Sequence, residues 1–196
     1  MQVTALILAG GRGTRMGGAD KGLVTYQGVR MIERVLARII PQVDQVIINA
    51  NRNLDTYQTL GYPVFTDASP HFDGPLAGMQ AGLHHTETDW IVSVPCDSPL
   101  LPLDLVQLLG AAIVKEKSLM AIARSTSGNH PVFCLMHRSL LASLTSFLDC
   151  GQRKVSTWQM QHQPAYVFFE ADQAFTNINS IDVSQPNTSH STSHAS

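Results

Sequence analysis

A glycine-rich segment with three basic side chains follows the first apolar run of the chain. Residues 8–21 read LAGGRGTRMGGADK and hold five glycines together with Arg12, Arg15 and Lys21. Glycine lets backbone N–H groups turn toward a ligand and approach it closely, and a nest of such groups binds anions. The basic side chains add full positive charge to the same segment. This combination favours a polyphosphate ligand over a surface loop with incidental charge.

Two common phosphate-binding motifs do not fit this segment. The dinucleotide motif GxGxxG would need a glycine at position 16 after Gly11 and Gly13, but Met16 stands there. A P-loop ends in Gly-Lys-Ser/Thr, whereas Lys21 follows Asp20 and precedes a glycine. The segment therefore predicts neither an NAD-binding protein nor a P-loop NTPase.

Carboxylates and amides follow three later apolar runs. Asp97 comes after residues 90–95, and this carboxylate is either a Mg²⁺ ligand or a turn residue before Ser-Pro. Asp67 follows residues 64–66, where a helix or turn cap is the alternative reading. Asn49 and Asn51 follow residues 46–48, and either they read a base edge or they form Asx turns.

The elements that would position these residues alternate along the chain. Short apolar, β-branched runs predict strands, and apolar residues at helical spacing predict helices. The expected strands span residues 3–8, 46–48, 64–66, 90–95, 120–123, 131–135 and 166–169, and the expected helices span 31–40, 76–85, 103–113 and 137–148. Such alternation indicates an α/β fold with a mostly parallel sheet. Ligands in this class bind outside the carboxyl ends of the strands, where the polar residues above are found.

Composition narrows the function classes. The 196 residues are 44% hydrophobic and only 14% charged, with a net charge of −2. A general nucleic-acid or membrane-surface binder would show a basic excess, so no nucleic acid and no membrane partner is expected. Three scattered cysteines without a CxxC pair argue against a zinc knuckle, and free thiols suit a reducing cytoplasm.

The domain organisation is simple. Residues 1–183 are expected to form one domain, because no linker or internal repeat interrupts the alternating pattern. Residues 184–196 are rich in Ser, Thr, Asn and His, and their composition predicts a disordered tail. His190 and His194 could bind a metal there, but a solvated polar tail is the favoured interpretation.

The glycine-rich segment resembles the signature of nucleotidyltransferases that build activated metabolites, and among them the molybdenum cofactor guanylyltransferases (MobA). The pattern LAGGxxxRMGGxDK matches at residues 8–11, 15–18, 20 and 21, with Gly13 where the family often has serine. Further similarity lies in NANR, GPLAGM, PCDSP and NIN, which begin at residues 49, 74, 95 and 177. The resemblance covers almost the whole chain except the tail.

This resemblance implies a Rossmann-like, GT-A-like nucleotidyltransferase fold, a three-layer sandwich, and a specific reaction. The expected enzyme transfers GMP from GTP to molybdopterin, releases pyrophosphate and needs Mg²⁺. Arg15, Lys21 and Asp97 are expected to be catalytic, with Asp97 as the metal ligand. The residues expected to bind the nucleotide, the metal or the pterin are Leu8, Ala9, Gly10, Gly11, Lys21, Asn51, Asp67, Gly78, Asp97, Asn177 and Asn179.

For the second substrate the resemblance supports Asn177 and Asn179. The pair Arg153–Lys154 is an additional candidate, with a solvated helix start as the equal alternative. His130 matches a family position but is not expected to be a base, because a phosphate nucleophile is already ionised. Cys96 is expected to be a packing residue, since no neighbouring histidine in the sequence would activate it.

Several alternatives stay open. A cytidylyltransferase of the same cofactor or a sugar-phosphate nucleotidyltransferase would share the glycine-rich segment, although LAGG rather than LAAG favours guanine by resemblance. A non-catalytic nucleotide-binding module is a second class, against which Asp97 argues. By family analogy the protein works as a monomer and hands its product to cofactor-insertion proteins and molybdoenzymes.

Overall fold

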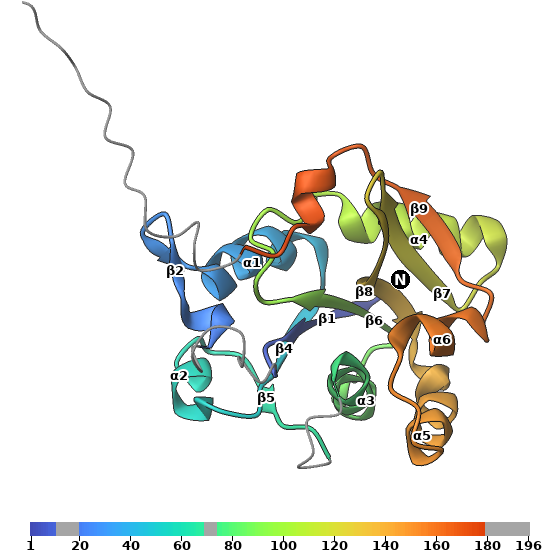
Figure 1. Ribbon diagram of the computed structural model, residues 1–196, viewed down its shortest axis with the longest axis horizontal. Helices are drawn as coiled ribbons and strands as arrows, with labels where there is room; N and C mark the ends of the chain where they lie inside the picture. Colours follow the sequence, from blue (N-terminus) through green and yellow to red (C-terminus); the bar gives the residue numbers. More distant parts are fainter. Residues whose placement is uncertain (11–19, 69–73, 179–196) are drawn as a thin grey trace, which may run out of the picture.

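The computed structural model describes residues 1–10, 20–68 and 74–178. In this part of the chain a seven-stranded sheet runs in the order β5–β4–β1–β6–β8–β7–β9 (Figure 1). Its strands are β1 (Val3–Leu8), β4 (Gln45–Asn49), β5 (Val64–Phe65), β6 (Trp90–Pro95), β7 (Met120–Ser125), β8 (Gly128–His137) and β9 (Ala165–Phe168).

One strand of this sheet runs against the others. β1 is parallel to β4 and β6, β4 is parallel to β5, and β7 is parallel to β9. β8 is antiparallel to both β6 and β7. The carboxyl ends of β1, β4, β5, β6, β7 and β9 therefore lie along a single edge, together with the start of β8.

Helices complete the two outer layers. They are α1 (Met31–Ile39), α2 (Leu54–Gln58), α3 (Pro75–His85), α4 (Leu105–Glu116), α5 (Leu141–Asp149) and α6 (Val155–Met160), with 3-10 turns η2 (Lys21–Leu23), η3 (Ile40–Gln42), η4 (Arg138–Leu140) and η5 (Asp172–Phe175). Pro75 stands first in α3, where the helix needs no N–H donor from it. A small hairpin of β2 (Thr25–Tyr26) and β3 (Val29–Arg30) precedes α1.

Two hydrophobic cores lie on opposite faces of the sheet. One packs α1 and α4 against it through side chains such as Val35, Ile39 and Leu109. The other packs α3, α5 and α6 through side chains such as Met79, Leu144 and Trp158. Figure 1 shows these two helix layers above and below the strands. The predicted three-layer α/β architecture with a mostly parallel sheet is confirmed.

The structure corrects several element bounds. The helix expected at 137–148 begins later, because β8 continues to His137 and the turn η4 comes before α5. The short helices α2 and α6 and the β2–β3 hairpin lie outside the expected elements. Each of these spans six residues or fewer, too short to show a clear hydrophobic period. The tail expected at 184–196 lies outside the described residues.

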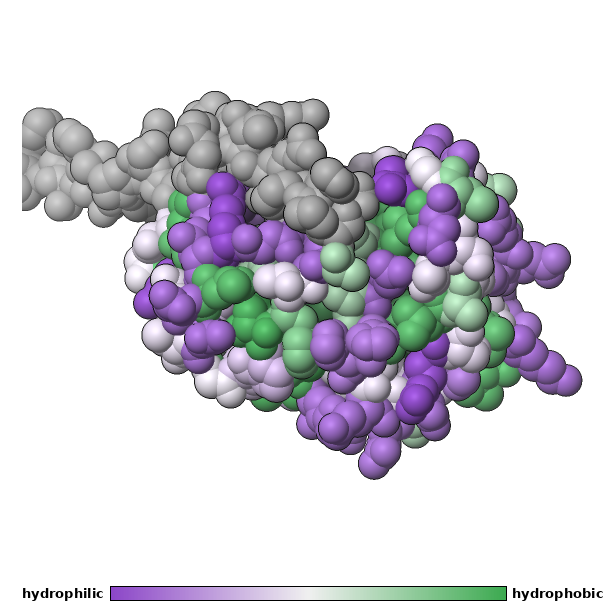
Figure 2. Space-filling view, turned by 90° about the horizontal axis from the view of Figure 1, so that it is seen from below, coloured by the Kyte–Doolittle hydropathy of each residue, from purple (hydrophilic) through white to green (hydrophobic). Residues whose placement is uncertain are grey.

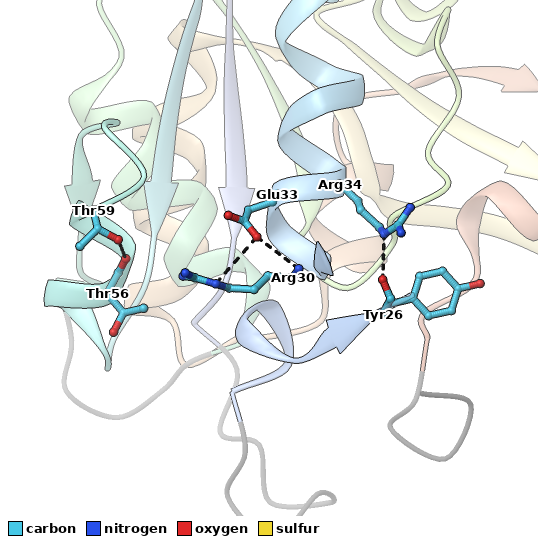
Figure 3. Close-up of polar contacts among 6 residues, drawn as sticks. All are labelled: Tyr26, Arg30, Glu33, Arg34, Thr56 and Thr59. Atoms are coloured by element: carbon cyan, nitrogen blue, oxygen red, sulfur yellow. Dashed lines mark hydrogen bonds and ion pairs between the residues drawn. The ribbon is translucent and has the colours of Figure 1, made fainter. Parts of the chain in front are cut away.

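The β2–β3 hairpin is tied to α1, as Figure 3 shows. The Arg34 Nε donates to the Tyr26 carbonyl at 2.9 Å, and the Arg30 amide donates to the Glu33 carboxylate at 3.2 Å. The Met31 amide also donates to the Val24 carbonyl at 3.0 Å. These bonds tie the chain that follows Lys21 to the first turns of α1.

The outer faces are mixed in character. Figure 2 views the molecule from below Figure 1, and hydrophilic side chains cover much of that face around smaller hydrophobic patches. Among the described residues, no helix is both long enough and apolar enough to cross a membrane.

Candidate active site

A cavity of about 380 Å³ opens at the carboxyl edge of the sheet. Its walls come from the ends of β1, β4 and β6, the start of α3, and the segments around Lys21 and Asn177. The lining residues are Leu8, Ala9, Gly10, Asp20, Lys21, Asn49, Arg52, Asp67, Gly74, Pro75, Pro95, Cys96, Asp97, Val132 and Asn177. The volume falls in the range of small-ligand sites, and the location agrees with the expectation from strand ends.

Lys21 and Asp97 form an ion pair at this cavity. Lys21 Nζ lies 3.0 Å from Asp97 Oδ2, although 76 positions separate the two residues in the sequence. The lysine side chain is 30% exposed and the aspartate side chain 9% exposed, so the cation faces the open part of the site. The sequence predicted both as catalytic, and the structure brings them together.

The Asp97 carboxylate suits an ion that arrives with a nucleotide. Mg²⁺ prefers one or two carboxylates combined with phosphate oxygens and waters. No group of three or more His, Cys, Asp or Glu side chains that could hold a metal occurs within residues 1–10, 20–68 and 74–178. Among the carboxylates at the cavity, Asp97 is the one paired with Lys21, and it is the residue that would hold a Mg²⁺ arriving with phosphate oxygens.

Asp20 is held by several donors just before Lys21. Its carboxylate accepts a hydrogen bond from Tyr57 Oη at 2.6 Å and another from Asn53 Nδ2 at 3.0 Å, and Arg52 Nε lies 3.8 Å away. Burial, reinforced by the Asp20 hydrogen bond, raises the pKa of Tyr57 far above its usual range, so the phenol stays a donor. Asp20 thus fixes the backbone from which Lys21 projects.

Sequence reasoning missed Tyr57 and Asn53 as supports of the site. Both belong to the short helix α2 and its N-terminal flank, which carry no motif and no clear period. Their importance depends on a partner more than thirty positions away. The available signal for this support is a tyrosine in an otherwise apolar position, because a buried tyrosine hydroxyl needs a hydrogen-bond partner.

Asp67 joins the two asparagines after β4. Asn49 Nδ2 donates to one oxygen of the Asp67 carboxylate at 2.9 Å, and Asn51 Nδ2 donates to the other at 2.7 Å. In turn, the Asp67 backbone amide donates a hydrogen bond to Asn51 Oδ1 at 2.9 Å. Asn49 and Asp67 line the cavity, whereas Asn51 lies behind them against the Gly10 carbonyl at 3.4 Å. Asn51 therefore orients Asp67, and its contact with a nucleotide stays a prediction.

Of the residues predicted to bind a ligand, Leu8, Ala9 and Gly10 line the cavity, but Gly78 does not. A Cβ on Gly78 would lie 2.5 Å from Asn49 Oδ1 and 2.6 Å from Leu8 Cδ2. Glycine at this position lets α3 approach the ends of β1 and β4 closely. The predicted ligand contact of Gly78 stays untested, while its packing role beneath Asn49 is clear.

We expect Gly78→Ala to destabilise the fold by about 1–3 kcal/mol, because the added methyl overpacks a close contact. The matched control is Gly110→Ala in α4, where a Cβ would meet its nearest atom at 3.7 Å. That variant should gain about 0.4–1 kcal/mol through reduced chain entropy in the unfolded state. Urea unfolding of both variants measures the difference. Equal free energies of unfolding would contradict the close-packing role of Gly78.

Asn177 lines the far side of the cavity and accepts a hydrogen bond from the buried Ser98 hydroxyl at 3.0 Å.

Gly11, Arg15 and Asn179 lie outside the described residues, so their predicted roles stay predictions. Arg153 and Lys154 do not line the cavity. Arg153 donates to the Leu148 carbonyl at 2.7 Å and Lys154 occupies the N-cap position of α6, in accord with the helix-start alternative.

Cys96 occupies a packing position. Its side chain is buried beneath Gly22, where a Cβ would lie 3.1 Å from Cys96 Sγ. Burial raises the pKa of the Cys96 thiol well above its usual value, so the nucleophilic thiolate is suppressed.

Iodoacetamide labelling tests this assignment. Cys150 is exposed, whereas Cys96 and Cys134 are buried. The folded protein should gain one carbamidomethyl group at Cys150 and the unfolded protein three, as mass spectrometry of the intact chain would show. Rapid labelling of Cys96 in the folded protein would contradict its packing role.

The cavity at the carboxyl edge, with Lys21 and Asp97 paired in it, lies where open α/β sheets bind their ligands. The chain belongs to the MobA-like NTP transferase family, whose domain model matches residues 5–165.

Curated relatives align along nearly the full length. A molybdenum cofactor guanylyltransferase of Cupriavidus taiwanensis is 50% identical over 185 residues, covering 92% of this chain and 93% of the relative. One from Bordetella petrii is 47% identical over 183 residues, covering 91% of this chain and 93% of the relative.

Solved structures share the fold. Molybdopterin-guanine dinucleotide biosynthesis protein A of Archaeoglobus fulgidus superposes with a TM-score of 0.68 at 21% identity, covering 90% of this chain and 92% of that one. A protein of Aquifex aeolicus superposes with a TM-score of 0.71 at 17% identity over the same shares of the two chains.

Proposed function

We propose that this nucleotidyltransferase acts in molybdenum cofactor biosynthesis and transfers GMP from GTP to molybdopterin, with release of pyrophosphate. The observation that carries the proposal is the Lys21–Asp97 pair at 3.0 Å inside the cavity at the carboxyl edge. Relatives called molybdenum cofactor guanylyltransferase, about half identical over nine-tenths of the chain, support the choice of substrates.

The proposed reaction is a direct displacement. A phosphate oxygen of molybdopterin attacks the α-phosphorus of GTP and forms a new P–O bond. The bond from that phosphorus to the β-bridging oxygen breaks, and its electron pair leaves with pyrophosphate. Because the attacking phosphate is already ionised near neutral pH, no side chain has to act as a general base.

The chain contributes positioning and positive charge, which are the main needs of phosphoryl chemistry. In the proposal Lys21 turns from Asp97 to the triphosphate, and the backbone at Gly10 approaches the phosphates closely. The segment that continues to Gly11 and Arg15 adds N–H donors and a guanidinium by resemblance. Asp97 would hold Mg²⁺, which supplies charge neutralisation on the phosphate oxygens when bound.

The base would lie toward Asn49 and Asp67. These side chains present amide and carboxylate groups at the wall opposite Asn177. A guanine offers N–H donors that a carboxylate accepts, so this wall is compatible with GTP.

Nucleotide binding followed by turnover tests the function. Calorimetry with GTP, CTP, ATP and UTP in Mg²⁺ should show selective binding of GTP, and added molybdopterin should then yield the guanine dinucleotide and pyrophosphate. Preference for CTP would keep the class and move the protein to cytidylyl transfer. Failure to bind or turn over any nucleotide, with molybdopterin present or absent, would contradict the proposal.

The proposal extends to the surroundings of the enzyme. Three free cysteines suit a reducing cytoplasm. We propose that the protein works there as a monomer and passes its product to cofactor-insertion proteins and molybdoenzymes. Light scattering of the purified chain tests the monomer directly.

A further inference from the structure

The segment that follows β9 crosses back along the carboxyl edge of the sheet. We call residues 169–178 the C-terminal strap. It begins where the Phe169 amide donates to the Arg124 carbonyl at 2.8 Å and ends where the Ile178 amide donates to the Asp97 carbonyl at 3.0 Å. Figure 1 shows the orange-to-red chain turning back from β9 across the top of the molecule. The strap therefore connects the outer strands to the Asp97 loop.

A hydrogen-bonded cluster outside the cavity anchors this strap. Ser125 ends β7 and His130 lies near the start of β8, so both stand at the carboxyl edge. The Ser125 hydroxyl bonds to both the Asp172 carboxylate and His130 Nε2, the second at 2.7 Å. The Ser127 amide donates to the same Asp172 oxygen at 3.0 Å.

The donor directions in this cluster follow from the chemistry. A carboxylate only accepts, so Ser125 donates its proton to Asp172 and its oxygen accepts from His130 Nε2–H. Hydrogen bonds from Ser125 and then from Ser127 lower the pKa of Asp172 to about 2, which keeps it a carboxylate at neutral pH. Burial lowers the pKa of His130, which favours the neutral tautomer that carries its proton on Nε2.

Aromatic packing strengthens the same anchor. The His130 ring stacks on Phe175 of the strap with centroids 4.3 Å apart and planes within 10°. Phe133 and Phe169 contact Phe175 edge-on, and Phe175 is only 5% exposed. His130 thus holds the strap twice, by its ring face to Phe175 and, through Ser125, by its nitrogen to Asp172.

The other end of the strap forms part of the cavity. Asn177 lines it and receives a hydrogen bond from Ser98, a residue that is fully buried after β6. None of Ser125, His130 or Asp172 lines the cavity. The cluster can therefore influence the reaction only through the placement of Asn177 and the Asp97 loop.

The geometry also indicates which substrate the strap serves. In the sheet order, Asn49 and Asp67 belong to the β4–β5 side of Asp97, whereas the strap lies on the β8–β7–β9 side. An in-line displacement places attacking and leaving groups on opposite sides of the reacting phosphorus. In the proposed function the leaving pyrophosphate lies against the backbone at Gly10, which follows β1 on the side of Asp97 away from the strap. The attacking phosphate therefore enters from the side of the strap.

We propose that Ser125, His130 and Asp172 are positioning residues for the second substrate, because they hold the strap so that Asn177 contacts the incoming molybdopterin. This inference rests on the proposed function. It predicts that weakening the anchor impairs use of molybdopterin and leaves GTP binding intact.

The test compares four variants of the full chain. Asp172→Ala should raise the KM for molybdopterin about tenfold, as loss of one or two hydrogen bonds implies, while the Kd for GTP changes less than twofold. Asp172→Asn keeps an acceptor oxygen and should restore most of the loss. His130→Phe keeps the stack on Phe175 and should show a smaller defect than His130→Ala.

Two control variants match the chemistry elsewhere in the fold. His137→Phe alters a histidine of the same strand that also bonds a serine and contacts an aromatic ring, Trp90. Asp44→Ala alters an aspartate that accepts from the Val3 amide. Both should leave the KM for molybdopterin unchanged. In hydrogen exchange, Asp172→Ala but not Asp44→Ala should speed exchange of the Ile178 amide.

The outcomes separate the inference from the function on which it rests. If Asn177→Ala raises the KM for molybdopterin while both Asp172→Ala and His130→Ala behave as wild type, the anchor has no positioning role. Parallel loss of GTP and molybdopterin binding in Asp172→Asn and His130→Phe would also overturn it, since that indicates general loosening. A wild-type chain that turns over no nucleotide would contradict the proposed function and the inference with it.

Discussion

Asp97→Asn should reduce Mg²⁺-dependent turnover by about 10³-fold and leave the thermal midpoint within a few degrees of wild type. The substitution keeps the size of the side chain but removes the negative charge that would hold Mg²⁺ at the cavity. Lewis-acid stabilisation by a bound ion contributes several kcal/mol to a transition state, and 1.36 kcal/mol corresponds to a tenfold change in rate. Steady-state assays with GTP and molybdopterin measure the loss.

The fold should tolerate this change because Lys21, the partner of Asp97, keeps 30% of its side chain exposed and remains solvated. Asp104→Asn is the matched control, since this exposed aspartate follows the same strand and does not line the cavity. Mn²⁺ binding followed by EPR in the presence of GTP gives a readout without turnover, and it should weaken only in Asp97→Asn. Full Mg²⁺-dependent activity of Asp97→Asn would show that the metal assignment is wrong.

Lys21→Met should weaken GTP binding by about 10–100-fold, because the variant loses the charge-assisted hydrogen bonds expected from Lys21 to the triphosphate. Such bonds contribute about 1.5–3 kcal/mol each, and methionine keeps most of the apolar length of the lysine. Turnover should fall further than binding, because positive groups stabilise the charge that develops on the phosphate oxygens in the transition state. Calorimetry with GTP and Mg²⁺ measures the affinity.

The same substitution should have an opposite effect on the metal alone. Lys21 Nζ pairs with Asp97 Oδ2 at 3.0 Å, so removal of the lysine ammonium leaves the carboxylate available to a metal cation. Mn²⁺ should therefore bind the nucleotide-free Lys21→Met protein more tightly than wild type. Lys115→Met, at an exposed site on α4, should change neither affinity. Unaltered GTP affinity in Lys21→Met would contradict the phosphate role of the lysine.

The sequence alone determined the alternation of strands and helices and the places along the chain where chemistry would be found. Apolar runs such as residues 3–8 and 90–95 specify buried strands, and the stripe from Met31 to Ile39 specifies a helix, because these patterns are local properties of the chain. The carboxyl ends of parallel strands share one edge. The motif residues Lys21 and Asp97 could therefore be assigned to one site before their contact was known.

The tertiary structure decided which polar groups meet. Three contacts of the site join residues that are far apart in the sequence. Lys21 and Asp97 are 76 positions apart, and Tyr57 and Asp20 are 37 positions apart. His130 holds the strap by stacking on Phe175 and by a hydrogen bond to Ser125. The order of the strands in the sheet creates these contacts, and that order cannot be predicted from the local hydrophobic periodicity of the sequence.

The same division explains the reversed strand and the helper residues. β8 turns back beside β7 through a tight connection at Ser125–Gly128, and this brings Val132 to the wall of the cavity and His130 to the strap outside it. Polar residues such as Asn51 and Asp172 look in the sequence like ordinary turn residues. Distant partners give them their roles, because their side chains make specific hydrogen bonds that only the folded chain can supply.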